Sequence, residues 1–195
     1  FEATILTLDS EHKNLQYDYT TISKGIIRTA EKITGYSAQG YTWSISPDSI
    51  YGKIIEAGKA EYIPLAVDLF AEALPKPLRP LTQKMMQLLG VEQGIIAPLH
   101  VDEETLGLMC VFGSKDLSQE ELPAIDSFAG QVAVSLRNAR LAQQIQEELS
   151  ARRQAEEKLQ ASLSTFEGIF NGITEAIYIL DENGLFLNVN LGAEK

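Results

Sequence analysis

The residues most able to carry chemistry are few: one cysteine, Cys110, two histidines, His12 and His100, and an acidic run, Asp102–Glu104. A single cysteine excludes an internal disulfide and a cysteine-rich zinc site. The histidines are too few and too isolated to indicate a metal cluster. Cys110 lies in an apolar run, where a free cysteine usually behaves as a small buried hydrophobe. We therefore expect neither a metal site nor a catalytic residue here.

The acidic run falls between two predicted strands. Catalytic carboxylates need a shielded cleft that separates their pKa values, whereas a polar turn is solvated. His100 ends the preceding strand and is interpreted as a surface histidine. Since no nucleophile–base pair or metal set is found, an enzyme is only a remote alternative.

Composition narrows the class further. The chain has 195 residues, enough for one domain and part of another, and its formal net charge is −11. Nucleic acid is therefore not expected as a partner, because phosphate neutralisation needs clustered Lys and Arg. No apolar run approaches the roughly 18 residues of a membrane helix, so we expect no membrane contact from this segment and a cytoplasmic location.

Alternating apolar and polar residues predict the elements that position these side chains. A loose loop, Asp9–Asn14, and a turn, Asp102–Thr105, each separate two such runs, which predicts two antiparallel hairpins. The predicted strands of this region are Ala3–Leu8, Leu15–Thr20, Ala60–Ile63, Gly94–Val101 and Leu106–Phe112.

Short helices are predicted between the hairpins. The first covers Ile22–Ile33 and is ended by Gly35. A second is expected to begin at Ser46, with Pro47 at its first position, and to stop at Gly58. Thr82 is expected to cap a third, which ends at Leu89 with Gly90 after it. The segment Leu65–Leu81 carries Pro75, Pro77 and Pro80 and is predicted to be a loop-rich lid.

A longer helix follows. Ser118 and Glu121 have the spacing of a capping box. The apolar residues that follow form one stripe, which we expect to pack on the sheet. They are Leu122, Ile125, Ala129, Val132, Leu136 and Ala139.

No Gly or Pro interrupts Gln131–Glu167, which predicts a helix roughly 55 Å long at about 1.5 Å per residue. Steps of four and three residues mark a heptad seam with charge at its centre. The seam predicts a parallel homodimer; the other interpretation is a monomeric helix with a ragged apolar face. The seam residues are Ile145, Leu149, Arg152, Glu156, Leu159 and Leu163, continuing to Phe166 and Phe170.

After Gly172 the residue pattern changes from helical to β-type. Ala176–Leu180 and Leu185–Asn190 are short β runs around a turn that contains Asn183-Gly184, a strong hairpin signal. Because two strands cannot form a stable core alone, we expect them to open a domain that continues beyond Lys195.

Residues 1–140 resemble a GAF domain. The resemblance rests on Ile96–Leu99, on Leu106–Val111 and on the helix Phe128–Leu141; Ser49–Ile63 also resembles the short helix before the GAF binding loop. It implies an α+β fold, an antiparallel sheet flanked by helices. The N-terminal helix of the family is expected to be missing, and the proline-rich loop departs from the pattern.

Residues 166–195 resemble the opening of a PAS domain. The matching residues are Phe170–Ile173, Ala176–Asp181, Asn183-Gly184 and Val189-Asn190, and Glu148–Leu163 is similar to linkers found just before PAS domains. The order GAF domain, signalling helix (141–165) and PAS domain is common in sensor histidine kinases. It implies downstream PAS and kinase or other output domains, although no kinase motif is present in this chain.

The GAF resemblance also implies a small-molecule pocket beneath Trp43–Gln87, although filling of the core explains each residue equally well. Bilin is not expected, since Val111 rather than His follows Cys110. A cyclic nucleotide is disfavoured, because Ser114–Glu121 keeps Lys115 and an acidic pair but lacks the other residues of that pattern. The predicted pocket residues are Trp43, Tyr51, Leu69, Phe70, Met85, Met86, Ile96 and Pro98.

The sequence thus predicts a sensory input region, not itself an enzyme, of a signal-transduction protein such as a sensor histidine kinase. A ligand would bias how the sheet packs on the stripe, and the dimeric helix would carry that bias onward, with Arg152 and Glu156 as its two-state element. The alternative is a GAF module without a ligand that serves dimerisation and spacing.

Overall fold

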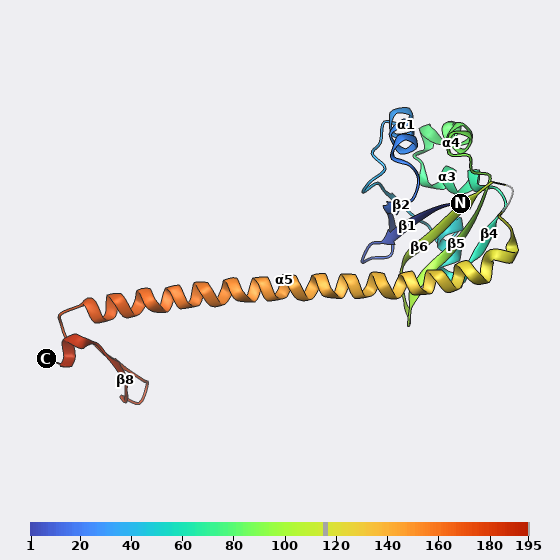
Figure 1. Ribbon diagram of the computed structural model, residues 1–195. Helices are drawn as coiled ribbons and strands as arrows, with labels where there is room; N and C mark the ends of the chain where they lie inside the picture. The colour runs from blue at the N-terminus through green and yellow to red at the C-terminus, as the bar shows by residue number, and fades with distance from the viewer. Residues whose placement is uncertain (115–116, 195) are drawn as a thin grey trace. The chain divides into compact units, whose positions relative to one another are not determined.

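A six-stranded antiparallel sheet organises residues 1–139, which cluster as one unit of the chain (Figure 1). We describe a computed structural model, which covers residues 1–114 and 117–194. The strand order is β3-β2-β1-β6-β5-β4. Both predicted hairpins, β1–β2 and β5–β6, are confirmed. The strands are β1 (Glu2–Leu8), β2 (Asn14–Thr20), β3 (Thr42–Ser44), β4 (Glu61–Ile63), β5 (Gln93–Val101) and β6 (Glu104–Gly113).

Short helices connect the strands. Left-handed glycines end α1, α2 and α4, as local sequence predicted for all three. The predicted start of α2 at Ser46 was wrong: Ser49 caps the helix, its hydroxyl accepting from the Gly52 amide at 2.9 Å. The helices are α1 (Lys24–Thr34), α2 (Ile50–Ala57), α3 (Ala66–Ala73), η1 (Lys76–Leu81) and α4 (Thr82–Leu89).

The prediction that Leu65–Leu81 is rich in loops was also wrong, whereas its role as a lid stays a prediction. Residues 66–73 form α3, and a 3-10 helix, η1, follows. All three prolines of this segment come after α3, so they do not interrupt it. Ala66 and Leu69 are fully buried and fix the helix on the sheet. Thr82 is the first residue of α4 rather than a cap, and its hydroxyl donates to the Arg79 carbonyl at 2.7 Å.

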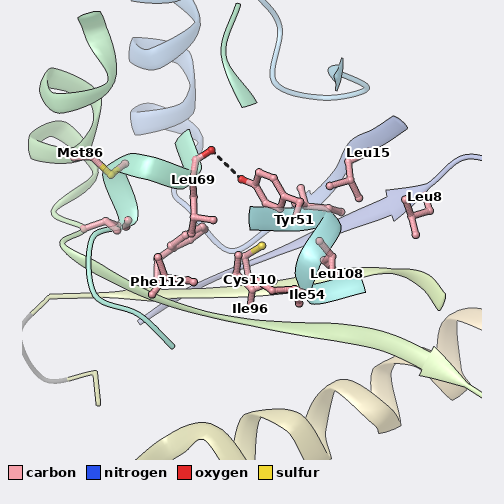
Figure 2. Close-up of a cluster of buried hydrophobic side chains, with 14 residues drawn as sticks. Leu8, Leu15, Tyr51, Ile54, Leu69, Met86, Ile96, Leu108, Cys110 and Phe112 are labelled. Atoms are coloured by element: carbon pink, nitrogen blue, oxygen red, sulfur yellow. Dashed lines mark hydrogen bonds between the residues drawn. The ribbon is translucent and has the colours of Figure 1, made fainter. Parts of the chain in front are cut away.

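Side chains along the central strands point alternately to the two faces of the sheet, which divides the core into two layers. One face of the sheet meets the short helices, and we call this layer the cavity-side core (Figure 2). The other face meets the start of helix α5 (Leu122–Gly172), and we call it the helix-side core. The helix-side core comprises Ala97, Leu99, Val101, Leu106, Met109, Ala129 and Ala133. The cavity-side core includes Leu6, Leu15, Ile54, Leu69, Ile96, Leu108, Cys110 and Phe112.

The start of α5 is fixed as the sequence predicted. A short 3-10 turn, η2 (Gln119–Glu121), carries the capping box, in which Glu121 accepts from the Ser118 amide at 2.8 Å. Ala129 and Ala133 are fully buried against the sheet. Arg137 pairs with Asp102 at 2.6 Å, which ties the helix to the β5–β6 turn.

Residues 140–195 form a second unit, which is described by itself. It contains the rest of α5, the hairpin of β7 (Tyr178–Leu180) with β8 (Phe186–Val189), and the 3-10 turn η3 (Leu191–Glu194). The predicted hairpin is therefore confirmed as a hairpin. Asn190 is fully buried, and its side-chain amide donates to the carbonyls of Ile173 and Glu175.

Candidate ligand cavity

A cavity of about 140 Å³ lies between the short helices and one face of the sheet. Helices α1, α3 and α4 contribute one side, and strands β1, β2 and β6 contribute the other. Seven of the chain's 15 aromatic residues (7 Phe, 7 Tyr and 1 Trp) line it, so its wall is largely aromatic. They are Tyr17, Tyr36, Tyr41, Trp43, Tyr51, Phe70 and Phe112.

Four of these rings form a ladder that begins at the partly exposed Tyr36 and ends at the buried Tyr51. Successive ring centroids, from Tyr36 through Tyr41 and Trp43 to Tyr51, lie 5.7, 5.8 and 5.7 Å apart. The Tyr41 hydroxyl donates to the Ala73 carbonyl at 2.9 Å, and the Tyr51 hydroxyl donates to the Leu69 carbonyl at 3.1 Å. These bonds attach the ladder to α3.

Cys110 and Phe112 rise from β6 toward the helices that carry Tyr51 and Leu69 (Figure 2). Burial raises the pKa of the Cys110 thiol to about 12. Burial, with smaller contributions from Cys110 and Glu72, raises the pKa of Tyr51 well above its ordinary value. Both groups are therefore neutral near pH 7, and Cys110 lacks the thiolate that a nucleophile requires.

The wall of this cavity is largely apolar. Burial raises the pKa of the Tyr17 hydroxyl, which nearby Thr20 and Thr4 hydroxyls lower in part. The Trp43 Nε1 is buried and, within residues 1–114 and 117–194, has no hydrogen-bond partner. Glu31 is the one charged side chain among the described lining residues, and its Oε1 accepts from the Ala38 amide at 2.9 Å and the Ser37 hydroxyl at 3.3 Å.

The cavity brings together half of the predicted pocket residues. Trp43, Tyr51, Phe70 and Met85 line it. Leu69, Met86 and Ile96 belong to the cavity-side core but do not line the cavity, and Pro98 is buried in β5 and does not line it either. No ligand is present to test the set, so their binding role stays a prediction.

Sequence reasoning missed the contributions of α1 and β2. Ile27, Ala30 and Thr34 line the cavity from α1, at helical spacing, and Tyr17 lines it from β2. The spacing on α1 was visible in the sequence as one face of a helix. The sequence did not show that this face of α1 lines a cavity, because the cavity forms only where segments distant in the sequence meet.

The seam residues are exposed in the single chain. Ile145, Leu149, Leu159 and Leu163 expose half or more of their surface. The Arg152 Nε donates to Glu156 at 2.9 Å within the same helix. No partner chain is present, so the dimer stays a prediction.

His100 and Asp102 do not line the cavity. Asp102 pairs with Arg137, and the His100 Nδ1 lies 3.0 Å from the Thr105 hydroxyl. Within the described chain, no three His, Cys, Asp or Glu side chains are grouped to hold a metal ion. Lys115, part of the predicted cyclic-nucleotide pattern, lies outside the described residues. None of the helices in the described part has the length and apolar character needed to span a bilayer.

Comparison with known proteins agrees with this architecture. Residues 5–136 match the family model of the GAF domain. The match covers more than half of the chain, which therefore belongs to the GAF domain family. No match was found among curated proteins.

Solved structures with a similar fold include the second GAF domain of DevS from Mycobacterium smegmatis (13% identity, TM-score 0.48, 74% of this chain and 85% of that one). Another is the GAF domain of a two-component sensor histidine kinase from Bacillus halodurans (12%, 0.47, 73% and 84%). A third is a methyl-accepting chemotaxis protein, residues 122 to 287 (15%, 0.48, 72% and 80%). Similarities of this size say nothing of what the chain binds.

Proposed function

We propose that this chain is the sensory input region of a signal-transduction protein, in which the cavity binds a small molecule and α5 carries the signal. The observation that supports this most directly is the double contact made by β6. Cys110 and Phe112 of this strand line the cavity, whereas the neighbouring Met109 and Val111 pack with α5 on the opposite face.

This strand is a short physical route from ligand to helix. Protein interiors are close-packed, so a ligand that displaces Cys110 or Phe112 also shifts the strand on which Met109 sits. Met109 belongs to the same core as Ala129 and Ala133 of α5. Because alanine side chains leave the helix close to the sheet, a small shift of the strand alters their contacts.

The organisation proposed for the chain follows the sequence. Residues 1–140 form the sensor domain, 141–165 the signalling helix, and 166–195 the beginning of a PAS domain. The exposed apolar seam supports a parallel homodimer, because exposed apolar side chains at heptad spacing are buried by pairing. A sensor histidine kinase is the proposed context, with the kinase outside this chain.

Binding is tested with a thermal-shift screen of metabolites on the 195-residue protein. A ligand that binds only the native state raises its melting temperature. Ala73→Leu adds three carbon atoms to the cavity wall and should abolish the effect of any true ligand. Ala71→Leu is the matched control, since Ala71 lies on the same helix but does not line the cavity.

Signal transfer is tested by disulfide cross-linking along the seam. Leu163→Cys places a thiol on the seam, and Ser164→Cys places one beside it. Native Cys110 does not interfere, because it is buried with a raised pKa. A ligand identified in the screen should change the cross-linking rate at position 163 more than at position 164. If binding occurs but both rates stay constant, the signalling role is wrong.

The same screen separates the alternative, a GAF module that serves only dimerisation and spacing. That module predicts strong cross-linking at position 163 and no metabolite whose effect depends on Ala73. The observation in favour of it is the exposed seam, which both functions share. The aromatic-lined cavity of about 140 Å³ favours ligand binding.

A further inference from the structure

We infer that this cavity takes up an uncharged, apolar molecule of about the size of one substituted benzene ring. This inference rests on the proposed function, since it names the ligand class of the same site. It is carried by the volume of the cavity, by the position of the one charged side chain on its described wall, and by the hydrogen bonds that the hydroxyl groups of the wall already make.

The volume of the cavity and the rings of its wall set the size and shape of the ligand. The cavity measures about 140 Å³, and an apolar cavity of about 150 Å³ in another protein takes up benzene. One aromatic ring with a short substituent therefore fills the space. The ladder of rings from Tyr36 to Tyr51 offers edges and faces to which such a ring is attracted.

The one charged side chain on the described wall lies at the mouth of the cavity. Glu31 and Ser37 also border a more open hollow on the surface, which the exposed cations Arg28 and Lys32 line with them. The Glu31 Oε1 accepts from the Ser37 hydroxyl and from the Ala38 amide, which ties it to the loop after α1. Because two cations lie beside it and its oxygen is already bonded, Glu31 holds the loop rather than selecting a cationic ligand.

The deeper part of the wall carries no charge. It is formed by buried residues, namely Leu6, Ile22, Tyr51, Met85, Cys110 and Phe112. Burial raises the pKa of both Tyr51 and Cys110, so both groups are neutral near pH 7. Among the described lining residues there is no Lys, Arg or His, so a carboxylate or phosphate would be buried without a counter-ion. A charged ligand would therefore lose its hydration and gain no partner.

Away from the mouth, the hydrogen-bond donors of the wall are either paired within the chain or out of reach. Three hydroxyls donate to backbone carbonyls at 2.9–3.1 Å, namely those of Thr34, Tyr41 and Tyr51. The Thr4 hydroxyl lies 3.0 Å from that of Thr20. The Tyr17 hydroxyl and the Trp43 Nε1 are buried with almost no exposed surface, so a ligand in the cavity does not reach them. A carbonyl group on the ligand would therefore lose its hydration without gaining a donor, which favours an apolar ligand.

The experiment compares four probes by calorimetric titration of the 195-residue protein. α-Methylstyrene is an apolar ring with a short substituent, and acetophenone has nearly the same shape with a carbonyl oxygen in place of the methylene group. Benzoate is the anionic analogue, and choline tests whether the aromatic wall and Glu31 select a cation. α-Methylstyrene should bind at least about tenfold more tightly than acetophenone, because a buried carbonyl without a donor costs affinity. Benzoate and choline should not bind.

Variants that fill the cavity locate the bound probe. Ala73→Leu enlarges a residue of the wall and should abolish the binding of α-methylstyrene, whereas Ala71→Leu leaves the wall unchanged and should bind it as the native chain does. Ala30→Leu repeats the test from α1, and it also serves if Ala73→Leu does not fold. Binding that survives in both wall variants would place the probe outside the cavity and overturn the inference.

Other outcomes separate this inference from the proposed function. Acetophenone that binds as tightly as α-methylstyrene overturns the apolar ligand, and tighter binding of benzoate or choline overturns the uncharged one. If all four probes fail while a screened metabolite binds and is lost in Ala73→Leu, the ligand class is wrong and the sensory function stands. If neither the probes nor any metabolite binds, both are wrong.

Discussion

Replacing the charged pair at the centre of the seam tests the predicted dimer most directly. Arg152 and Glu156 occupy seam positions and bond to each other within one helix, with 78% and 63% of their side chains exposed. The double variant Arg152→Leu, Glu156→Leu makes the seam apolar from Ile145 to Phe170. We expect the dimer to become more stable.

The size of this effect follows from the area that pairing removes from water. Full burial of a leucine side chain contributes about 1.5–3 kcal/mol, and two chains supply four leucines at partly buried positions. Losing the exposed ion pair in each helix offsets about 0.3–0.5 kcal/mol per pair. The net gain is at least about 2 kcal/mol, which lowers the dissociation constant of the dimer at least about thirtyfold.

The sequence itself provides a matched control. Arg153 and Glu157 directly follow the seam pair, so Arg153→Leu, Glu157→Leu has the same composition with the leucines off the seam. Sedimentation equilibrium over a dilution series gives both dissociation constants. The seam variant should dimerise more tightly and the control should resemble the native chain. Equal tightening in both variants would show nonspecific association and would refute the seam.

Three further predictions concern the GAF domain. Leu108→Ala, at a fully buried position, should lower the free energy of unfolding by about 2–5 kcal/mol in urea titrations, whereas Leu65→Ala, 59% exposed, should change it by less than about 0.5 kcal/mol. Gly107→Ala should destabilise the domain, because its Cβ would overlap the backbone of β1, whereas Gly130→Ala, with open space around it, should stabilise α5 by about 0.5–1 kcal/mol. Burial raises the pKa of the Cys110 thiol to about 12, so between about pH 9 and 12 only the thiol of the unfolded chain ionises. The free energy of unfolding should therefore fall as the pH rises through this range. Chemical denaturation at each pH should show a flatter decline for Cys110→Ala.

Local signals made much of the fold predictable. The capping box at Ser118, and the glycines at positions 35, 58 and 90, act through contacts within a few residues of themselves. The hairpins follow from alternation that one buried face imposes on each strand. These features need no knowledge of the rest of the chain, and the structure agrees with them.

The errors arose where distant contacts decide the local structure. Helix α3 was missed because three prolines dominate the segment, yet burial of Ala66 and Leu69 on the sheet stabilises the eight residues before them. Strand β3 was missed because its three residues pair with β2 across a long connection. Four of the predicted pocket residues do not line the cavity, since apolar composition alone does not separate a cavity wall from a filled interior.

The seam and the cavity are linked by thermodynamics if the proposed function is right. A ligand that shifts the helix between two arrangements must bind one of them more tightly. Reciprocity then requires the favoured arrangement to bind the ligand more tightly by the same factor. A seam without Arg152 and Glu156 should therefore change the affinity of a cavity that its residues never touch. A module that serves only spacing has no such coupling between seam and cavity. The effect of the seam variant on the binding of a ligand found in the thermal-shift screen therefore distinguishes a sensor from a spacer without the output domain.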